Sequence, residues 1–176
     1  MKVVYNILVA LFILVSVSGC RVMSDEMPPV YEKSTLVKVG DIAPDFTVTM
    51  IDGSSVTLSH LQGRTVLLVF FNTQSAECRT QLAVLGSAVR EFGSEKFSLL
   101  TISTAEQATD VAEFINKKKY TFPVGVDSDS SIFNLYATEY TPRCFVIDPL
   151  GRVIALSADY NNSEFELLCQ VIASQM

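Results

Sequence analysis

Two residues in the middle of the chain have the types and spacing for thiol chemistry. Ser75 and Cys78 lie three positions apart, after the apolar run Val66–Phe71 and at the start of a helical pattern. A cysteine in the first turn of a helix faces backbone N–H groups and the positive end of the helix dipole, and both favour the thiolate. Exchange between a dithiol and a disulfide needs two thiols, however, and a serine hydroxyl cannot form a disulfide. The pair therefore indicates a thiol site that lacks one of its two sulfur atoms.

The residues around Cys78 predict a thiol of modest reactivity. The hydroxyl of Ser75 is a weak nucleophile without a neighbouring base, and the only histidine, His60, lies in a separate predicted loop. Ser75 is instead suited to cap the helix that follows, which contributes ~1 kcal/mol to its stability. Glu77 favours the helix N-terminus, but its negative charge disfavours a thiolate at Cys78.

The four cysteines lie at positions 20, 78, 144 and 169. Cys20 is expected to carry a lipid, which leaves three thiols, an odd number that cannot all pair within the chain. Cys144 could replace the missing partner of Cys78 if their Cα atoms lie within about 7 Å. The alternative is that Cys144 is a small apolar residue in a buried strand, because free cysteines are often fully buried. Cys169 is expected to be a core residue of the last helix.

The first 40 residues predict export and anchoring. Lys2 precedes nine consecutive apolar residues, Ile7–Val15, which are too few for a membrane span of about 20 residues and are typical of a signal peptide. The segment ends at Cys20 in a pattern that resembles a bacterial lipobox. We therefore expect a signal peptide at 1–19, a lipidated N-terminus and flexible tether at 20–39, and one domain at 40–176. The protein is expected in the bacterial cell envelope, lipid-anchored to the membrane, with its domain in the periplasm or on the outer surface.

The charge balance narrows the classes of partner. The chain has 19 acidic and 13 basic side chains. Removal of residues 1–19 takes away Lys2 alone among them, and 12 basic against 19 acidic side chains give the mature chain a net charge of −7. A surface of this sign does not favour nucleic acid or anionic membrane surfaces as partners.

The apolar patterns predict an α/β domain. The segments 46–50 and 55–57 form a hairpin around Asp52-Gly53, and 65–71 is a strand buried on both faces. Helical patterns at 76–92, 111–119, 132–136 and 165–172 alternate with strands at 97–102, 122–126, 145–147 and 153–156. The order β-β-β-α-β-α-β-α-β-β-α predicts a central mixed β-sheet with helices on both faces and an N-terminal β-hairpin.

Several motifs, in order and spacing, resemble thioredoxin-like proteins of the TlpA/ResA type, which are AhpC/TSA-related envelope thiol–disulfide oxidoreductases. The resemblance covers residues 40–176 and depends on Ala43-Pro44-Asp45-Phe46, on residues 58–64, on the segment around Cys78 and on Thr141-Pro142-Arg143-Cys144-Phe145-Val146-Ile147-Asp148. It implies a thioredoxin-like fold in which Pro142 is a cis-proline facing the active-site turn. It also implies that Ser75 replaces the attacking cysteine and that Cys78 is the resolving one.

Three further positions depart from the family pattern at the same site. Phe71 replaces a tryptophan, Gln81 a glutamate and Ala83 a proline. With Ser75 they form a cluster of four departures, while the motifs that define the fold remain. The resemblance therefore implies weakened redox chemistry at Cys78, with Ser75, Pro142 and a possible partner in Cys144 completing the candidate site, and with protein thiols and disulfides as partners.

Two other functions remain open from the sequence. The first is a non-catalytic binding module that holds an extended segment of another protein in the thioredoxin-like groove. The second is a peroxiredoxin-like peroxidase, because Ser75 and Cys78 have the spacing of that pattern. Phe71 stands where that pattern has a proline, and Arg143 lies one residue from the expected arginine. No metal site or cofactor is expected, since Cys78 and His60 alone would be a poor set of metal ligands.

Overall fold

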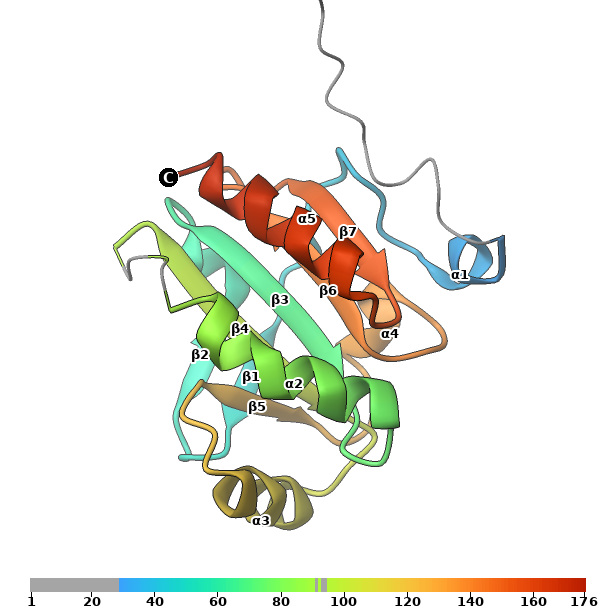
Figure 1. Ribbon diagram of the computed structural model, residues 1–176, viewed down its shortest axis with the longest axis vertical. Helices are drawn as coiled ribbons and strands as arrows, with labels where there is room; N and C mark the ends of the chain where they lie inside the picture. The colour runs from blue at the N-terminus through green and yellow to red at the C-terminus, as the bar shows by residue number, and fades with distance from the viewer. Residues whose placement is uncertain (1–28, 91, 93–94) are drawn as a thin grey trace, which may run out of the picture.

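Strand β3 (Thr65–Phe71) lies at the centre of the computed structural model, which describes residues 29–90, 92 and 95–176 (Figure 1). All seven residues of β3 are buried, as its continuous apolar sequence predicts. Alternate side chains enter two separate cores, Val66, Leu68 and Phe70 on one face of the sheet and Leu67, Val69 and Phe71 on the other. Elements on both faces must therefore cover this strand.

The sheet has seven strands in the order β2-β1-β5-β4-β3-β6-β7. Their bounds are Thr47–Met50 for β1, Ser55–Thr57 for β2, Phe97–Thr104 for β4, Val124–Asp127 for β5, Arg143–Ile147 for β6 and Val153–Ala158 for β7. Strands β3, β4 and β5 are parallel, and every other pairing is antiparallel. The predicted mixed sheet and the predicted N-terminal hairpin, β1 with β2, are both confirmed.

Helices cover both faces of the sheet, as expected. Helices α2 (Ala76–Ala88), α3 (Ala108–Lys118) and α5 (Asn162–Ala173) pack on one face, which is turned toward the viewer in Figure 1. The 3₁₀ helix η2 (Leu58–Leu61) and the short helix α4 (Phe133–Tyr136) pack on the other.

Helix α2 is shorter than its apolar pattern predicts, because it ends at Ala88 rather than at Phe92. Beyond that point the amide of Arg90 bonds to the carbonyl of Ser87, and that of Phe92 to the carbonyl of Val89. These bonds span three residues rather than four, so the chain tightens into turns where the helix was expected to continue.

Part of the segment expected to be a tether contacts the domain. Helix α1 (Pro29–Ser34) begins the described chain, and Thr35 forms an isolated β-bridge with Ala137. The amide of Leu36 donates to the carbonyl of Tyr136 at 2.9 Å, and Val37 is buried in the core that contains α4. Contacts with the domain therefore begin before residue 40. The expected signal peptide and lipidated Cys20 lie outside the described residues and stay predictions.

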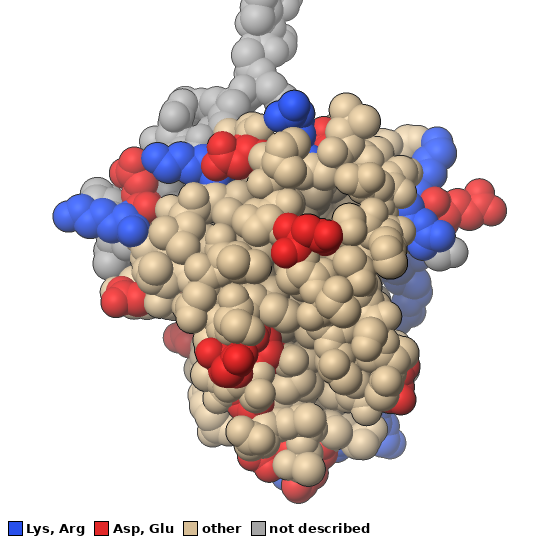
Figure 2. Space-filling view, turned by 180° about the vertical axis from the view of Figure 1, so that it is seen from behind, with Lys and Arg blue, Asp and Glu red and all other residues tan. Residues whose placement is uncertain are grey.

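Charged side chains are distributed unevenly on the face shown in Figure 2, which is the back of the molecule as seen in Figure 1. Acidic groups lie within this face, whereas Lys and Arg side chains lie at its edges. Within the part of the chain that the structure describes, no helix combines the length and the apolar character needed to cross a membrane.

Candidate active site

The connection from β3 to α2 carries the two residues that the sequence singles out. Ser75 has extended backbone angles and is the N-cap of α2, where its Oγ accepts a hydrogen bond from the amide of Cys78 at 3.1 Å. The same hydroxyl donates to a carboxylate oxygen of Glu77 at 2.9 Å. The capping prediction for Ser75 is therefore confirmed. Its hydroxyl holds the helix start, and its proton is directed to the carboxylate of Glu77, whose lowered pKa makes it too weak a base to activate the hydroxyl for attack.

The Cys78 thiol lies beneath this turn and is fully buried, with 0 % of the residue exposed. Its Sγ accepts a hydrogen bond from the amide of Asn72 at 3.3 Å. Burial raises the pKa of the Cys78 thiol above its ordinary value, and the negative charge of Glu77 adds to that rise. The hydrogen bond from the Asn72 amide and the nearby polar side chains of Ser75 and Thr141 lower this pKa, without overcoming burial. Cys78 is therefore a protonated, shielded thiol at neutral pH.

The loop before β6 closes the other side of the thiol. The peptide bond between Thr141 and Pro142 is cis, as the family resemblance implies, and Pro142 is buried. The Thr141 side chain lies near enough to the Cys78 thiol to lower its pKa, so the loop that holds Pro142 and the active-site turn come together near the sulfur. The carbonyl of Pro142 accepts from the amide of Asp159 at 2.9 Å, which ties the loop to the end of β7.

Cys144 shares a core with Cys78, but the two are not bonded. It pairs with Val69 across β3 and β6 and faces the same core as Cys78. Its Sγ accepts from the side-chain amide of Gln81 at 2.9 Å, and burial raises the pKa of the Cys144 thiol to about 12. All three described cysteines are free thiols, and a bond between Cys78 and Cys144 stays a prediction. Cys169 is half-buried on α5, at the margin of the core where it was expected.

Gln81 adds an unusual polar group to this core. It stands where the family resemblance implies a glutamate, and it is 1 % exposed. Its amide nitrogen bonds to Cys144, while its carbonyl oxygen Oε1 has no hydrogen-bond partner in the structure. A neutral amide here cannot take up or release a proton as a carboxyl group would. The buried proton acceptor that a glutamate would supply is therefore missing from the site.

Glu106 is a site residue that the sequence interpretation missed. It lies in the loop after β4, and its carboxylate accepts from the amide of Thr73 at 2.8 Å, from the Thr73 hydroxyl and from the Ser103 hydroxyl at 2.6 Å. Asn72 adds a bond from its side chain to the carbonyl of Thr104 at 3.1 Å. Parallel pairing of β3 with β4 brings the carboxyl ends of both strands to one edge, where functional groups gather in such sheets. Polar residues directly after a second buried strand were the signal available in the sequence.

Neither nearby arginine is placed to activate Cys78. Arg143 precedes Cys144, which faces the core of Cys78, and adjacent residues of a strand point to opposite faces. The Arg143 guanidinium therefore bonds to Ser34, Thr35 and Glu139 on the face away from Cys78. Arg79 is directed to the carbonyls of residues 73 and 74 in the turn. The displaced arginine that a peroxidase site would require is therefore not formed by Arg143.

His60 lies exposed on η2. Among the residues that the structure describes, no group of three or more His, Cys, Asp or Glu side chains could hold a metal ion.

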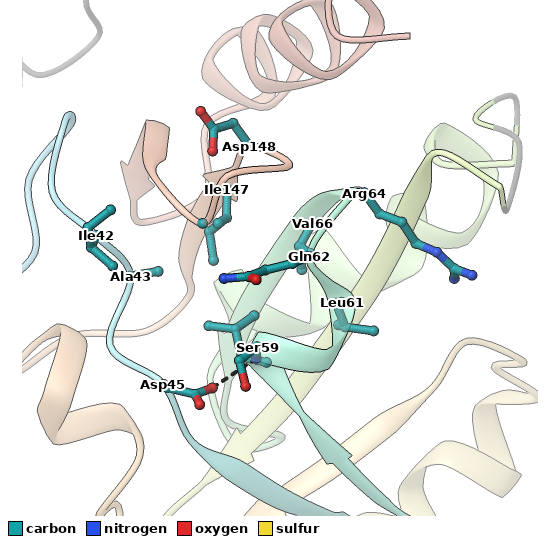
Figure 3. Close-up of a pocket in the computed structure, with 12 residues that line it drawn as sticks. Ile42, Ala43, Asp45, Ser59, Leu61, Gln62, Arg64, Val66, Ile147 and Asp148 are labelled. Atoms are coloured by element: carbon teal, nitrogen blue, oxygen red, sulfur yellow. Dashed lines mark hydrogen bonds between the residues drawn. The ribbon is translucent and has the colours of Figure 1, made fainter.

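A shallow pocket of about 110 Å³ lies at the start of β3, at the opposite end of that strand from the active-site turn (Figure 3). Ile42, Leu58, Val66 and Ile147 line its apolar side. Its carboxylates already accept backbone amides, Asp45 those of Phe46 and Ser59, and Asp148 those of Leu150 and Arg152. None of Ser75, Cys78, Pro142 and Cys144 is among the residues that line this pocket.

The chain is similar to known proteins over most of this domain. The model of the AhpC/TSA family matches residues 39–156. The thiol–disulfide oxidoreductase ResA of Geobacillus kaustophilus is 28 % identical over 123 residues, which cover 70 % of this chain and 71 % of that protein.

Solved structures agree with this assignment. A candidate protein disulfide isomerase from Bacteroides thetaiotaomicron is 32 % identical with a TM-score of 0.77, and the match covers 81 % of this chain and 92 % of that one. A candidate thiol:disulfide interchange protein DsbE from Chlorobium tepidum is 24 % identical with a TM-score of 0.73, covering 79 % and 98 % of the two chains. The latter likeness concerns the fold.

Proposed function

The chain belongs to the AhpC/TSA family, as a thioredoxin-like protein of the TlpA/ResA type, and from that premise we propose an envelope lipoprotein with weakened thiol–disulfide chemistry at Cys78. The observation that carries the proposal is the burial of this single thiol behind a capping serine. Cys78 is 0 % exposed, and Ser75, which by the family resemblance replaces the attacking cysteine, caps the helix in front of it.

The chemistry available to one thiol is limited in a definite way. A Cys78 thiolate that attacks a partner's disulfide forms a bond to one partner sulfur and releases the other as a thiolate. A second thiolate must then attack this mixed disulfide, and the Ser75 hydroxyl cannot do so. If Cys144 attacks the Cys78 sulfur, a Cys78–Cys144 bond forms and the partner leaves with both of its sulfurs reduced. Otherwise a further thiolate of the partner must attack the partner sulfur, which releases the Cys78 thiolate and leaves a disulfide within the partner.

Two features slow the first of these steps. The raised pKa of Cys78 keeps the thiolate fraction small at neutral pH. In addition, the sulfur is covered by the turn from Asn72 to Ser75 and by Thr141, so the turn or the loop must move before a partner sulfur can reach it. The disulfides of protein substrates are therefore expected to exchange slowly with the Cys78 thiol.

The same burial favours a second function, a binding module without turnover. The cis-proline loop that shapes the thioredoxin-like groove is kept, and the fold around it is intact. An extended segment of a partner could occupy this groove without touching the sulfur. Anchoring through a lipid on Cys20 would then hold the partner at the membrane surface.

Redox equilibration followed by peptide mass spectrometry separates these functions. The full chain in detergent micelles is equilibrated in glutathione buffers and alkylated, and Cys78, Cys144 and Cys169 are followed individually. Weakened chemistry predicts a reversible Cys78–glutathione adduct or a Cys78–Cys144 bond within roughly −180 to −300 mV. A Cys78 that stays reduced at every potential supports the binding module instead. Cys169 reports general thiol oxidation in the same sample.

The anchor has its own test, since it rests on the sequence alone. Metabolic labelling with a radioactive fatty acid should mark the native chain and leave a Cys20→Ala variant unmarked. A native chain without label, recovered from the aqueous phase after detergent phase separation, would refute the lipid.

A further inference from the structure

Residues 31–37, called the strap below, dock beside the loop that precedes the cis-proline. The amide of Leu36 donates to the carbonyl of Tyr136 at 2.9 Å, and the amide of Thr138 donates to the carbonyl of Ser34 at 2.9 Å. Thr35 pairs with Ala137 as an isolated β-bridge. The strap thus packs against the end of α4 and against the loop that follows it. Residues 139–142 of that loop are called the cis-proline loop.

Arg143 joins the strap to the cis-proline loop. It is the largest fully buried side chain of the described residues, with 1 % of its surface exposed. Its Nη1 and Nη2 donate to the hydroxyls of Thr35 and Ser34 at 2.6 and 2.5 Å. Its Nη2 and Nε donate to the carbonyls of Glu139 and Tyr140 at 2.9 and 3.2 Å. A buried guanidinium is stable only when its donors are paired, so it needs both segments in place.

Tyr31 completes the contact from the strap side. Its ring lies edge-on to that of Tyr140 with centroids 5.3 Å apart, and the Cζ atom of Arg143 lies 5.7 Å from the Tyr31 ring centroid. The Tyr31 hydroxyl donates to a carboxylate oxygen of Asp159 at 2.9 Å. The guanidinium is therefore enclosed by an aromatic ring and by acceptors from two chain segments far apart in sequence.

The cis-proline loop leads directly to the thiol. Tyr140, whose carbonyl accepts from Arg143, precedes Thr141, whose side chain lies near enough to the Cys78 thiol to lower its pKa. Two residues beyond Pro142, Cys144 packs in the same buried core as Cys78. Tyr140 also has a positive φ of 64°, a backbone conformation that non-glycine residues seldom adopt without support from their surroundings. A loop in this conformation is held by its contacts, and Arg143 supplies two of them, to Tyr140 and Glu139.

We propose that Arg143 is a positioning residue that couples docking of the strap to the closure of the cis-proline loop over Cys78. While the strap is docked, Arg143 holds the loop and the thiol is covered; release of the strap frees the loop and exposes the sulfur. The coupling is reciprocal, so a partner that engages Cys78 also loosens the strap. This deepens the proposed function and rests on it, because the regulated group is Cys78. The strap follows the segment expected to carry the lipid, so the anchor and the thiol are connected through it.

The test is the rate at which N-ethylmaleimide alkylates each cysteine of the full chain in detergent micelles, read by peptide mass spectrometry. Arg143→Met should accelerate the alkylation of Cys78 about tenfold, within the range of couplings between protein sites. Cys144 and Cys169 should keep their rates, which separates loop opening from general unfolding. Arg64→Met is the matched control, because Arg64 is exposed and makes one 3.4 Å bond to Ser98.

Hydrogen exchange measured on the same variants identifies the moving parts. The coupling predicts that amides of the strap and of the cis-proline loop lose protection together in Arg143→Met. Faster exchange in the strap alone, with Cys78 alkylated at the native rate, would overturn the proposal. If Arg143→Met does not fold, Thr35→Val carries the same test, because it keeps the side-chain shape and removes one acceptor of the guanidinium.

Alkylation needs no redox partner and therefore remains informative whether or not Cys78 exchanges with glutathione. A native chain that is inert to glutathione would refute weakened thiol exchange, while the alkylation rates of the variants would still decide the coupling.

Discussion

Replacing Glu106 by alanine should destabilise the fold by about 2–3 kcal/mol. Its carboxylate accepts three hydrogen bonds, two from Thr73 and one from Ser103, and these residues are only 6 % and 0 % exposed. Hydrogen bonds to a charged group contribute about 1.5–3 kcal/mol each when one partner is lost. The two hydroxyls can rotate toward other acceptors and Glu106 is half-exposed, so the total falls well below three full bonds. The fixed amide of Thr73 accounts for most of the loss.

Urea unfolding of the full chain in detergent micelles, followed by circular dichroism, measures this loss. Glu106→Gln keeps the volume and one acceptor oxygen and should lose about 1 kcal/mol. Glu113→Ala, at an exposed carboxylate on α3, is the control and should stay within about 0.5 kcal/mol of the native protein. Hydrogen exchange at the amide of Thr73 should rise in Glu106→Ala. A stability within about 0.5 kcal/mol of native and an unchanged Thr73 amide would refute the role assigned to Glu106.

Three further outcomes follow from local contacts. Ser75→Ala should lower the free energy of unfolding by ~1 kcal/mol through the lost cap, and it should raise the pKa of Cys78 further, read as slower alkylation at pH 8. The free energy of unfolding should fall above pH 9 by up to about 1.4 kcal/mol per pH unit. The reason is that Cys144 keeps its proton to about pH 12 in the folded protein, whereas the unfolded thiol loses it near 9.0. Urea unfolding of Cys144→Val should show a shallower fall over the same pH range. Gly125→Ala should destabilise the fold by about 1–3 kcal/mol, because its new Cβ would lie 2.7 Å from a methyl group of β1. In Gly86→Ala, on α2, the new Cβ would meet nothing closer than 3.6 Å. This substitution should therefore stabilise the fold by up to about 1 kcal/mol in the same measurement.

The elements of the fold follow from local patterns in the sequence. The unbroken apolar run of β3 predicts a strand covered on both faces, and its residues divide between the two cores. Ser75 is an N-cap by residue type and position, and the structure places it there. The cis bond before Pro142 follows from family resemblance rather than from the residues themselves. The strand, the helix cap and the cis-proline each depend on residues that are neighbours in the chain or on short motifs. A single sequence displays both.

The contacts that define the site join residues far apart in sequence, and no local pattern announces them. Glu106 reaches Thr73 across 33 positions, and Arg143 reaches Thr35 across 108. The direction of Arg143 depends on the register of β6 against β3, which sets Cys144 on the face of Cys78 and Arg143 on the other. The raised pKa of Cys78 likewise results from its complete burial. The sequence alone shows only two opposing influences on that pKa, the helix N-terminus, which lowers it, and the charge of Glu77, which raises it.

If the lack of a thiol at position 75 weakens the chemistry at Cys78, as we propose, restoring a thiol there should bring the activity back. Ser75→Cys in the full chain should catalyse the reduction of a protein disulfide such as that of insulin by dithiothreitol, measured as the rate above the uncatalysed reaction. Ser87→Cys, at an exposed serine of the same helix, is the matched control and should give no gain. We expect turnover in Ser75→Cys and almost none in the native chain. A native rate equal to that of Ser75→Cys, or no gain in Ser75→Cys, would contradict it.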